Sequence, residues 1–166
     1  MQTRYISTTE TAKIIRQELA KAFPGIKFSV RSESYSGGSS IDVGWTDGPT
    51  PKMVEKVAHQ FKAASFDSMI DLKTRHDSEW NGERVRFGPD YVFCNRTLST
   101  EFLQKVANRT AKEWGFEVPI VPVNKWGGLG GGLNARPGGG CFSIAELIYQ
   151  DARKTFFHNG LRCIEK

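Results

Sequence analysis

The chain has 166 residues, of which 39% are hydrophobic and 25% are charged, and its formal net charge is +5. This length allows one domain with a substantial core, and the composition argues against a disordered chain. Three cysteines, Cys94, Cys141 and Cys163, lie far apart without a CxxC pair, which indicates neither a zinc ribbon nor a disulfide scaffold. No apolar signal core and no apolar run long enough to span a membrane occurs, so we expect a cytoplasmic protein without a membrane partner.

The basic excess is concentrated in the second half of the chain. Residues 1–80 carry 11 lysines and arginines against 10 acidic residues, whereas residues 81–166 carry 12 against 8. Such an excess favours anionic partners such as nucleic acid. It is nevertheless weaker than the dense basic arm of a DNA-coating protein.

The first predicted element is a helix that begins after Ser7 and ends at Pro24-Gly25. Ser7 and Glu10 form an S-x-x-E capping box, and apolar residues then recur at helical spacing. Two stretches in which apolar and polar residues alternate follow, at residues 28–30 and 41–45. Their period of two predicts a β-hairpin.

The loop of this hairpin, YSGGSS at residues 35–40, contains Gly37 and Gly38. Consecutive amides of a glycine turn bind anions best where a helix begins immediately afterwards. A strand follows here and no Lys-Ser/Thr pair ends the motif, so a P-loop is excluded. We expect a hairpin tip whose glycines supply positive φ angles, and a phosphate- or partner-binding loop is the alternative.

The middle of the chain predicts a second helix, a second hairpin and a third helix. Thr50-Pro51 begins the second helix, with threonine as its N-cap. RVRFGPDYVFCNR, residues 84–96, contains two β-like runs joined by Gly88-Pro89-Asp90, which favours a hairpin. The third helix has Ser99 as its N-cap and Gly115 at its end.

Glycine dominates the composition after residue 116. GGLGGGLNARPGGG, residues 127–140, has eight glycines in fourteen positions and predicts a flexible loop. Its GGGLNA matches G-x-G-x-x-A, but Pro137 and the glycines after it prevent the helix that a dinucleotide site needs. We expect either a flexible segment that lets the last helix dock or a loop that becomes ordered on a partner, with these candidate contact residues: Gly130, Gly131, Gly132 and Arg136.

A last helix is predicted over residues 144–157, after a capping box formed by Ser143 and Glu146. The order of elements predicts an α+β fold with a mainly antiparallel sheet of hairpins and helices packed on one face. We divide the chain into a compact domain at residues 1–116, a Pro/Gly-rich linker at 117–140, and a C-terminal helical segment at 141–166 docked on the same domain.

Three stretches carry a resemblance to a known family. They are ISTTETAKIIRQELAKAFPGIKFSVRSESYSGGSSIDVGWTDGPT, FDSMIDLKTRHDSE and GERVRFGPDYVFCNR. Over roughly residues 4–96, the chain resembles the large polyvalent protein associated domain 29. Such domains are carried by plasmids, conjugative elements and phages, within long multidomain proteins or as separate chains. The resemblance implies a role in a mobile genetic element, such as protecting incoming DNA or countering host defences, and provides no catalytic residues to carry over.

The strongest indication of a binding site lies in the second predicted hairpin. Arg84 and Arg86 share one face of their strand, and Tyr91 and Phe93 share one face of theirs. If the two faces coincide, cations lie beside aromatic rings, which is the chemistry that holds phosphates and stacks bases. If the aromatic residues face the helices instead, they belong to the core, and the two arginines and Arg96 are still exposed.

No catalytic residue, metal site or cofactor is predicted. His76, Asp77 and Glu79 are residue types that ligate metals or transfer protons, but no second ligand pair has a recognisable spacing. We interpret these three residues as part of a solvated loop. Cys94, in the strand YVFCN, suits core packing better than nucleophilic catalysis.

Three classes of function stay open. The first is a non-catalytic accessory protein of a mobile genetic element that binds nucleic acid or a nucleic-acid complex. The second is a protein-binding inhibitor of a host defence system, of the anti-CRISPR kind, whose partner is a host protein or ribonucleoprotein complex. The third is a metal-dependent hydrolase or nuclease that uses the residues of RHDSE. The oligomeric state is not predicted.

Overall fold

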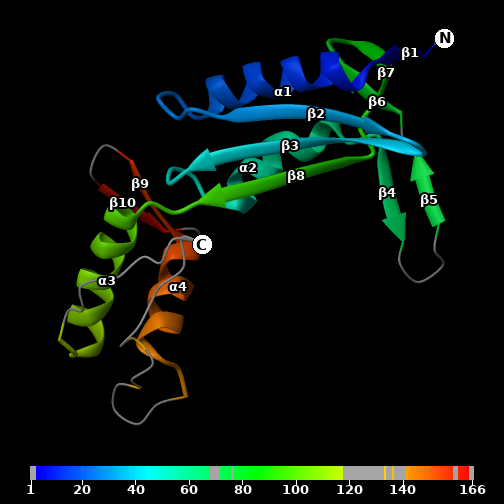
Figure 1. Ribbon diagram of the computed structural model, residues 1–166. Coiled ribbons are helices and arrows are strands. Elements are labelled where there is room, and N and C mark those ends of the chain that lie inside the picture. The colour runs from blue at the N-terminus through cyan, green and yellow to red at the C-terminus, as the bar shows by residue number, and fades with distance from the viewer. Residues whose placement is uncertain are drawn as a thin grey trace. The chain divides into compact units, whose positions relative to one another are not determined.

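A computed structural model describes residues 3–67, 72–75, 77–117, 133, 136, 141–158 and 161–164 (Figure 1). The chain forms two compact units: unit 1 consists of Met1–Trp45 and Pro51–Arg96, and unit 2 of Thr46–Thr50 and Thr97–Lys166. The helix at residues 100–114 lies in unit 2. None of the helices in the described ranges is long and apolar enough to cross a membrane.

Unit 1 confirms the predicted starts of its two α-helices. The Ser7 hydroxyl accepts from the backbone N–H of Glu10, whose carboxylate accepts from the Ser7 N–H, and the second helix begins at Pro51. In chain order, the elements are β1 (Arg4–Ile6), α1 (Thr8–Ala22), β2 (Ser29–Tyr35), β3 (Gly38–Thr46), α2 (Pro51–Ala58), the 3-10 helix η1 (His59–Phe61), β4 (Ala64–Asp67), β5 (Leu72–Arg75), β6 (Ser78–Trp80), β7 (Glu83–Phe87) and β8 (Tyr91–Thr97).

The strands of unit 1 form two mixed three-stranded sheets and the antiparallel pair β4–β5. In the sheet ordered β1-β7-β6, β1 is parallel to β7 and β6 is antiparallel to it. In the sheet ordered β2-β3-β8, β2 and β3 form the predicted hairpin, and β8 runs in the same direction as β3 (Figure 1). The α+β class is confirmed. Each of the two three-stranded sheets contains one parallel pair, however, and a sheet built only of hairpins has no parallel pair.

The hairpin predicted for residues 84–96 is wrong, because β7 and β8 belong to different sheets. The Asp90 N–H donates to the carbonyl of Ser39 (2.9 Å), and the Ser39 N–H donates to the Asp90 carboxylate (3.2 Å). The Pro89 carbonyl accepts from the Ala63 N–H (2.9 Å). These polar groups thus bond to β3 and to the segment after η1 instead of closing a turn between β7 and β8.

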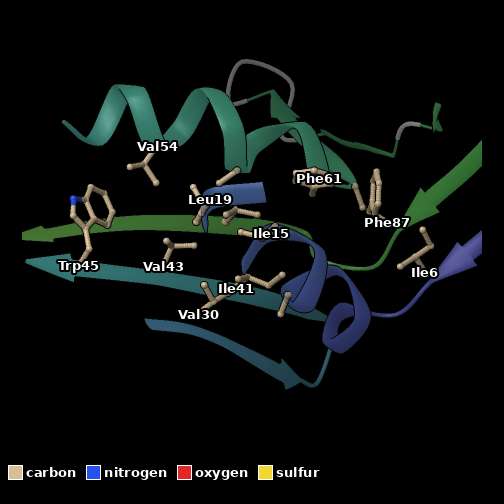
Figure 2. Packing of buried hydrophobic residues seen from close by; sticks show 14 of the residues in the cluster. Ile6, Ile15, Leu19, Val30, Ile41, Val43, Trp45, Val54, Phe61 and Phe87 are labelled. Atoms are coloured by element: carbon tan, nitrogen blue, oxygen red, sulfur yellow. The ribbon is translucent and has the colours of Figure 1, made fainter. Parts of the chain in front are cut away.

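One hydrophobic cluster forms the core of unit 1, against a single face of the β2-β3-β8 sheet (Figure 2). Helices α1 and α2 both contribute to it, and α2 passes behind β3 and β8 in Figure 1. The fully buried side chains of the cluster include Ile15, Leu19, Ile41, Val43, Val54 and Val85. Since both helices pack on this face, no helix among the described residues of unit 1 covers the opposite one.

Unit 2 contains α3 (Thr100–Trp114), α4 (Ile144–Lys154) and the antiparallel strands β9 (Thr155–His158) and β10 (Leu161–Ile164). The capping box at Ser143 is confirmed, but the last helix ends at Lys154, before the end predicted for it. The β-branched and aromatic residues Thr155, Phe156 and Phe157 favour a strand at that point. An ion pair between Arg109 of α3 and Asp151 of α4 joins the two helices beside their apolar contacts.

The first prediction concerns Gly88, which lies against the start of α1. A Cβ atom added there would approach the backbone N of Thr8 to 2.6 Å, so Gly88→Ala should lower the free energy of unfolding by about 1–3 kcal/mol. Urea unfolding measures this loss. Gly44→Ala is the matched control, since its nearest contact is the Asn95 carbonyl at 4.0 Å. Equal stability of both variants would contradict the close packing at Gly88.

The second prediction concerns the Arg109–Asp151 pair, whose side chains are 20% and 18% exposed. Asp151 also accepts from the Thr110 hydroxyl (3.1 Å). Asp151→Ala leaves a largely buried guanidinium without this carboxylate, so local stability should fall by about 2–3 kcal/mol. Faster hydrogen exchange of the α3 and α4 amides would report it. Gln150→Ala, at an exposed position of α4, should change exchange little.

Candidate nucleic-acid interface

Strand β8 directs alternate side chains to the two faces of its sheet. Val92 is buried in the core and Cys94 packs against it, so Tyr91, Phe93 and Asn95 lie on the opposite face. The same alternation places Tyr35 of β2 there, because Val30 points into the core. We call the surface formed by Tyr35, Tyr91 and Phe93 the aromatic face.

The Tyr91 and Phe93 rings are stacked, with centroids 6.0 Å apart and an angle of 9° between their planes. Phe93 is 49% exposed, which is unusual for a phenylalanine in a sheet. The Lys62 ammonium lies 6.0 Å from the centroid of the Tyr91 ring, at the outer limit of a cation–π contact. The arrangement therefore offers two flat rings with a cation at one end.

Tyr35 extends the aromatic face across the sheet to β2. It lies directly opposite Gly38 in the hairpin register and is 48% exposed. A Cβ atom on Gly38 would lie 3.2 Å from the Tyr35 ring and 2.6 Å from the Asp90 carboxylate. Gly38 thus allows the ring to lie close to the sheet, and its neighbour Gly37, with φ +94°, forms the predicted hairpin tip.

Few charges accompany these rings. Arg31 and Glu33 share the outward face of β2, and Arg31 lies opposite Asp42 of β3. The described cations of this surface are Arg31 and Lys62, and its described carboxylates are Glu33 and Asp42. The aromatic face is therefore close to neutral, and aromatic area is its dominant feature.

Arg84 and Arg86 lie on β7, in the other three-stranded sheet, so they do not share a hairpin face with the aromatic rings, which was one of the two alternatives open in the sequence. Both bind Asp77: the Arg84 Nε lies 3.2 Å and the Arg86 guanidinium 2.8 Å from its two carboxylate oxygens. The hydrogen bond from Arg86, with the positive charges of both arginines, lowers the pKa of Asp77. Arg96, predicted to be exposed, is half-buried and shares the side of β8 that carries Val92.

The structure describes only some of the other predicted site residues. Arg136 is exposed, whereas Gly130, Gly131 and Gly132 lie outside the described residues.

Of the RHDSE cluster, His76 also lies outside the described residues. Asp77 binds the two arginines of β7, and Glu79 pairs with Arg84 in the strand register. A metal or acid–base role for this cluster stays a hypothesis, as does a partner-binding role for the glycine loops.

Sequence reasoning missed Tyr35 and Lys62. The alternation of Val30, Arg31 and Glu33 was sufficient to place Tyr35 opposite the core, since the period of two continues to the hairpin tip. Lys62 has no such signal, because it follows a 3-10 helix and approaches Tyr91 only through the fold.

Unit 1 has two further features outside the aromatic face. The His59 Nε2 lies 3.1 Å from the Val92 carbonyl, at the outer edge of β8. Elsewhere in unit 1, Trp80 lies between two hollows along α1, of about 400 Å³ and 310 Å³. The larger hollow is lined by apolar residues, including Ile6 and Ile14, and by residues of both charge signs: Arg4, Lys13, Glu10 and Glu83.

Cys94 is half-buried against the core. Burial, with a smaller contribution from the charge of Glu55, raises the pKa of its thiol to about 12. The thiol is therefore protonated at neutral pH and is a poor nucleophile. Cys141, by contrast, is exposed.

The fold and this site define a small α+β protein with an open aromatic sheet face. Residues 6–99 match the family described as large polyvalent protein associated domain 29. The chain belongs to this family, as its resemblance predicted. No curated protein and no solved structure matches the chain.

The third prediction tests the Asp77 pairing. Replacing Arg86 by glutamine removes the largest cause of the lowered pKa, so the Asp77 pKa should rise toward its ordinary value of 3.8. A lowered pKa in the folded state stabilises the fold above the ordinary value, and this contribution is lost as pH falls through the lowered pKa. Carboxyl NMR titration measures the change. Lys13→Gln is a control in the same unit, and an unchanged Asp77 pKa in Arg86→Gln would contradict the pairing.

The fourth prediction concerns thiol reactivity. A pKa near 12 in place of 9.0 lowers the thiolate fraction at pH 8 by about a thousandfold. A variant that keeps only Cys94 should therefore react with iodoacetamide far more slowly than one that keeps only Cys141. Urea should abolish the difference. Rapid labelling of Cys94 in the folded protein would contradict its burial.

Proposed function

We propose that this protein is a non-catalytic accessory protein of a mobile genetic element, and that it binds nucleic acid through the aromatic face. The family supports the context, since we associate its domains with plasmids, conjugative elements and phages. The geometry of the β2-β3-β8 sheet supports the binding mode.

The observation that carries the proposal is the parallel pair of Tyr91 and Phe93 on a sheet face that no helix of unit 1 covers. Burying a phenylalanine side chain contributes about 1.5–3 kcal/mol, so leaving one exposed forgoes that stabilisation. A contiguous exposed aromatic surface marks a binding site more often than isolated exposed residues do. Nucleobases suit it, because every base has a flat π face and each base–aromatic stack contributes about 1–3 kcal/mol.

The nearby cations support the same partner. Lys62 lies beside Tyr91, and Arg31 lies on the same side of the sheet. Each can contact a phosphate of a strand whose bases lie on the rings. Arg84 and Arg86 contribute less in this proposal, because they share one carboxylate on the other sheet.

The fifth prediction tests the site. Phe93→Ala should weaken binding of a fluorescent oligonucleotide by about 5- to 150-fold, which corresponds to the loss of one stacking contact. Fluorescence anisotropy measures the affinity. Tyr5→Ala is the matched control, since Tyr5 is another exposed aromatic residue of unit 1, on β1.

Two outcomes would contradict parts of the proposal. If Phe93→Ala binds as tightly as the unaltered protein while Arg84→Gln/Arg86→Gln loses affinity, the binding surface lies on β7 and the aromatic face is excluded. If no variant and no nucleic acid gives binding, the proposed function itself fails.

The alternative is a protein-binding inhibitor of a host defence system. The larger hollow along α1 favours it, because a lining of apolar residues with charges of both signs suits a protein segment better than a polyanion. A pull-down that recovers one stoichiometric host protein without nucleic acid would support this alternative over the proposal. Gln17→Trp, which changes a residue lining that hollow, should then prevent the recovery.

A further inference from the structure

We infer that the aromatic face is selective for single-stranded nucleic acid, with two consecutive unpaired bases lying on Tyr91 and Phe93. This inference rests on the proposed function and specifies the class of its ligand. DNA and RNA strands share the chemistry involved, which is a flat base on a ring and a phosphate near a cation.

The spacing of the two rings is the first reason. Their centroids are 6.0 Å apart, whereas consecutive bases of a helical strand are separated by about 3.4 Å along the axis. Because the two rings are stacked, bases on their two outer faces have the ring pair between them and cannot stay stacked on each other. The bound strand is therefore extended, and its bases are neither helical nor paired.

The shape of the surface is the second reason. In a duplex the faces of the bases are covered by their neighbours, and only base edges are accessible in the grooves. Tyr91 and Phe93 belong to a sheet and present flat rings, and neither extends from a helix or loop that could enter a groove. Reaching a base face in a duplex costs a few kcal/mol of unstacking and unpairing, and an unpaired strand avoids that cost.

The charge of the surface is the third reason. Among the described residues, Arg31 and Lys62 are the cations of this face, and Glu33 and Asp42 oppose them. Duplex binding without groove contacts depends on many phosphate contacts. Two cations cannot supply them, so stacking provides most of the affinity.

The experiment compares ligands of equal length with the full chain. The probes are fluorescein-labelled oligothymidylate, oligouridylate and a blunt DNA duplex, measured by fluorescence anisotropy over a range of salt concentrations. Both single strands should bind at least about tenfold more tightly than the duplex, because the duplex must first unstack. For two phosphate contacts, the slope of log K against log salt should be about −1.4 for the single strands.

Substitutions at Phe93 separate stacking from apolar area. Phe93→Tyr keeps the ring and should bind within about threefold of the unaltered protein, whereas Phe93→Leu keeps apolar area without a ring and should lose at least about fivefold. An abasic oligonucleotide should lose more affinity than Phe93→Leu does, because it has no base for either ring. Circular dichroism of each variant verifies folding.

The possible results are distinct. Equal or tighter binding of the duplex that still depends on Phe93 overturns the single-strand inference and leaves the proposed function in place. A steep salt slope with equal affinity for the abasic strand also overturns the inference, since electrostatics then dominates. Absence of binding to all three probes refutes the proposed function as well.

Discussion

The reciprocal hydrogen bonds between Ser39 and Asp90 are the constraint on which the architecture of unit 1 depends. They join the end of the segment after β7 to the beginning of β3, so the chain enters the second sheet beside β3. Asp90 is 2% exposed, and the alternation of a strand then directs Tyr91 outward and Val92 inward. A shift of one residue would exchange the two faces and bury the aromatic rings. The same contact therefore determines both the topology and the exposed surface.

Local signals predicted what depends on neighbours in sequence. The capping boxes at Ser7 and Ser143, the proline at the start of α2 and the left-handed Gly115 at the end of α3 are confirmed. Pairing between strands far apart in the chain was not predictable in this way. Three residues with a glycine and a proline between two β-like runs favour a hairpin, but the bonds that redirect residues 88–90 come from Ser39 and Ala63. β1 was missed because three residues are too few to show a period.

The candidate site shows the same division. The outward direction of Tyr91 and Phe93 relative to Val92 was one of two alternatives open in the sequence, and burial of Val92 selects it. A count of basic residues contains no information about Asp77, which binds both Arg84 and Arg86 in the folded chain. The contact between Lys62 and Tyr91 joins residues that are distant in sequence and requires the folded chain.

The His59 contact at the outer edge of β8 has a consequence for solubility. An edge strand beside exposed aromatic residues is a template for intermolecular β-pairing, which leads to aggregation. At Val92 the imidazole of His59 occupies the carbonyl that an incoming strand would need. One of the protein's own side chains thereby obstructs strand addition from a second molecule at this position of β8.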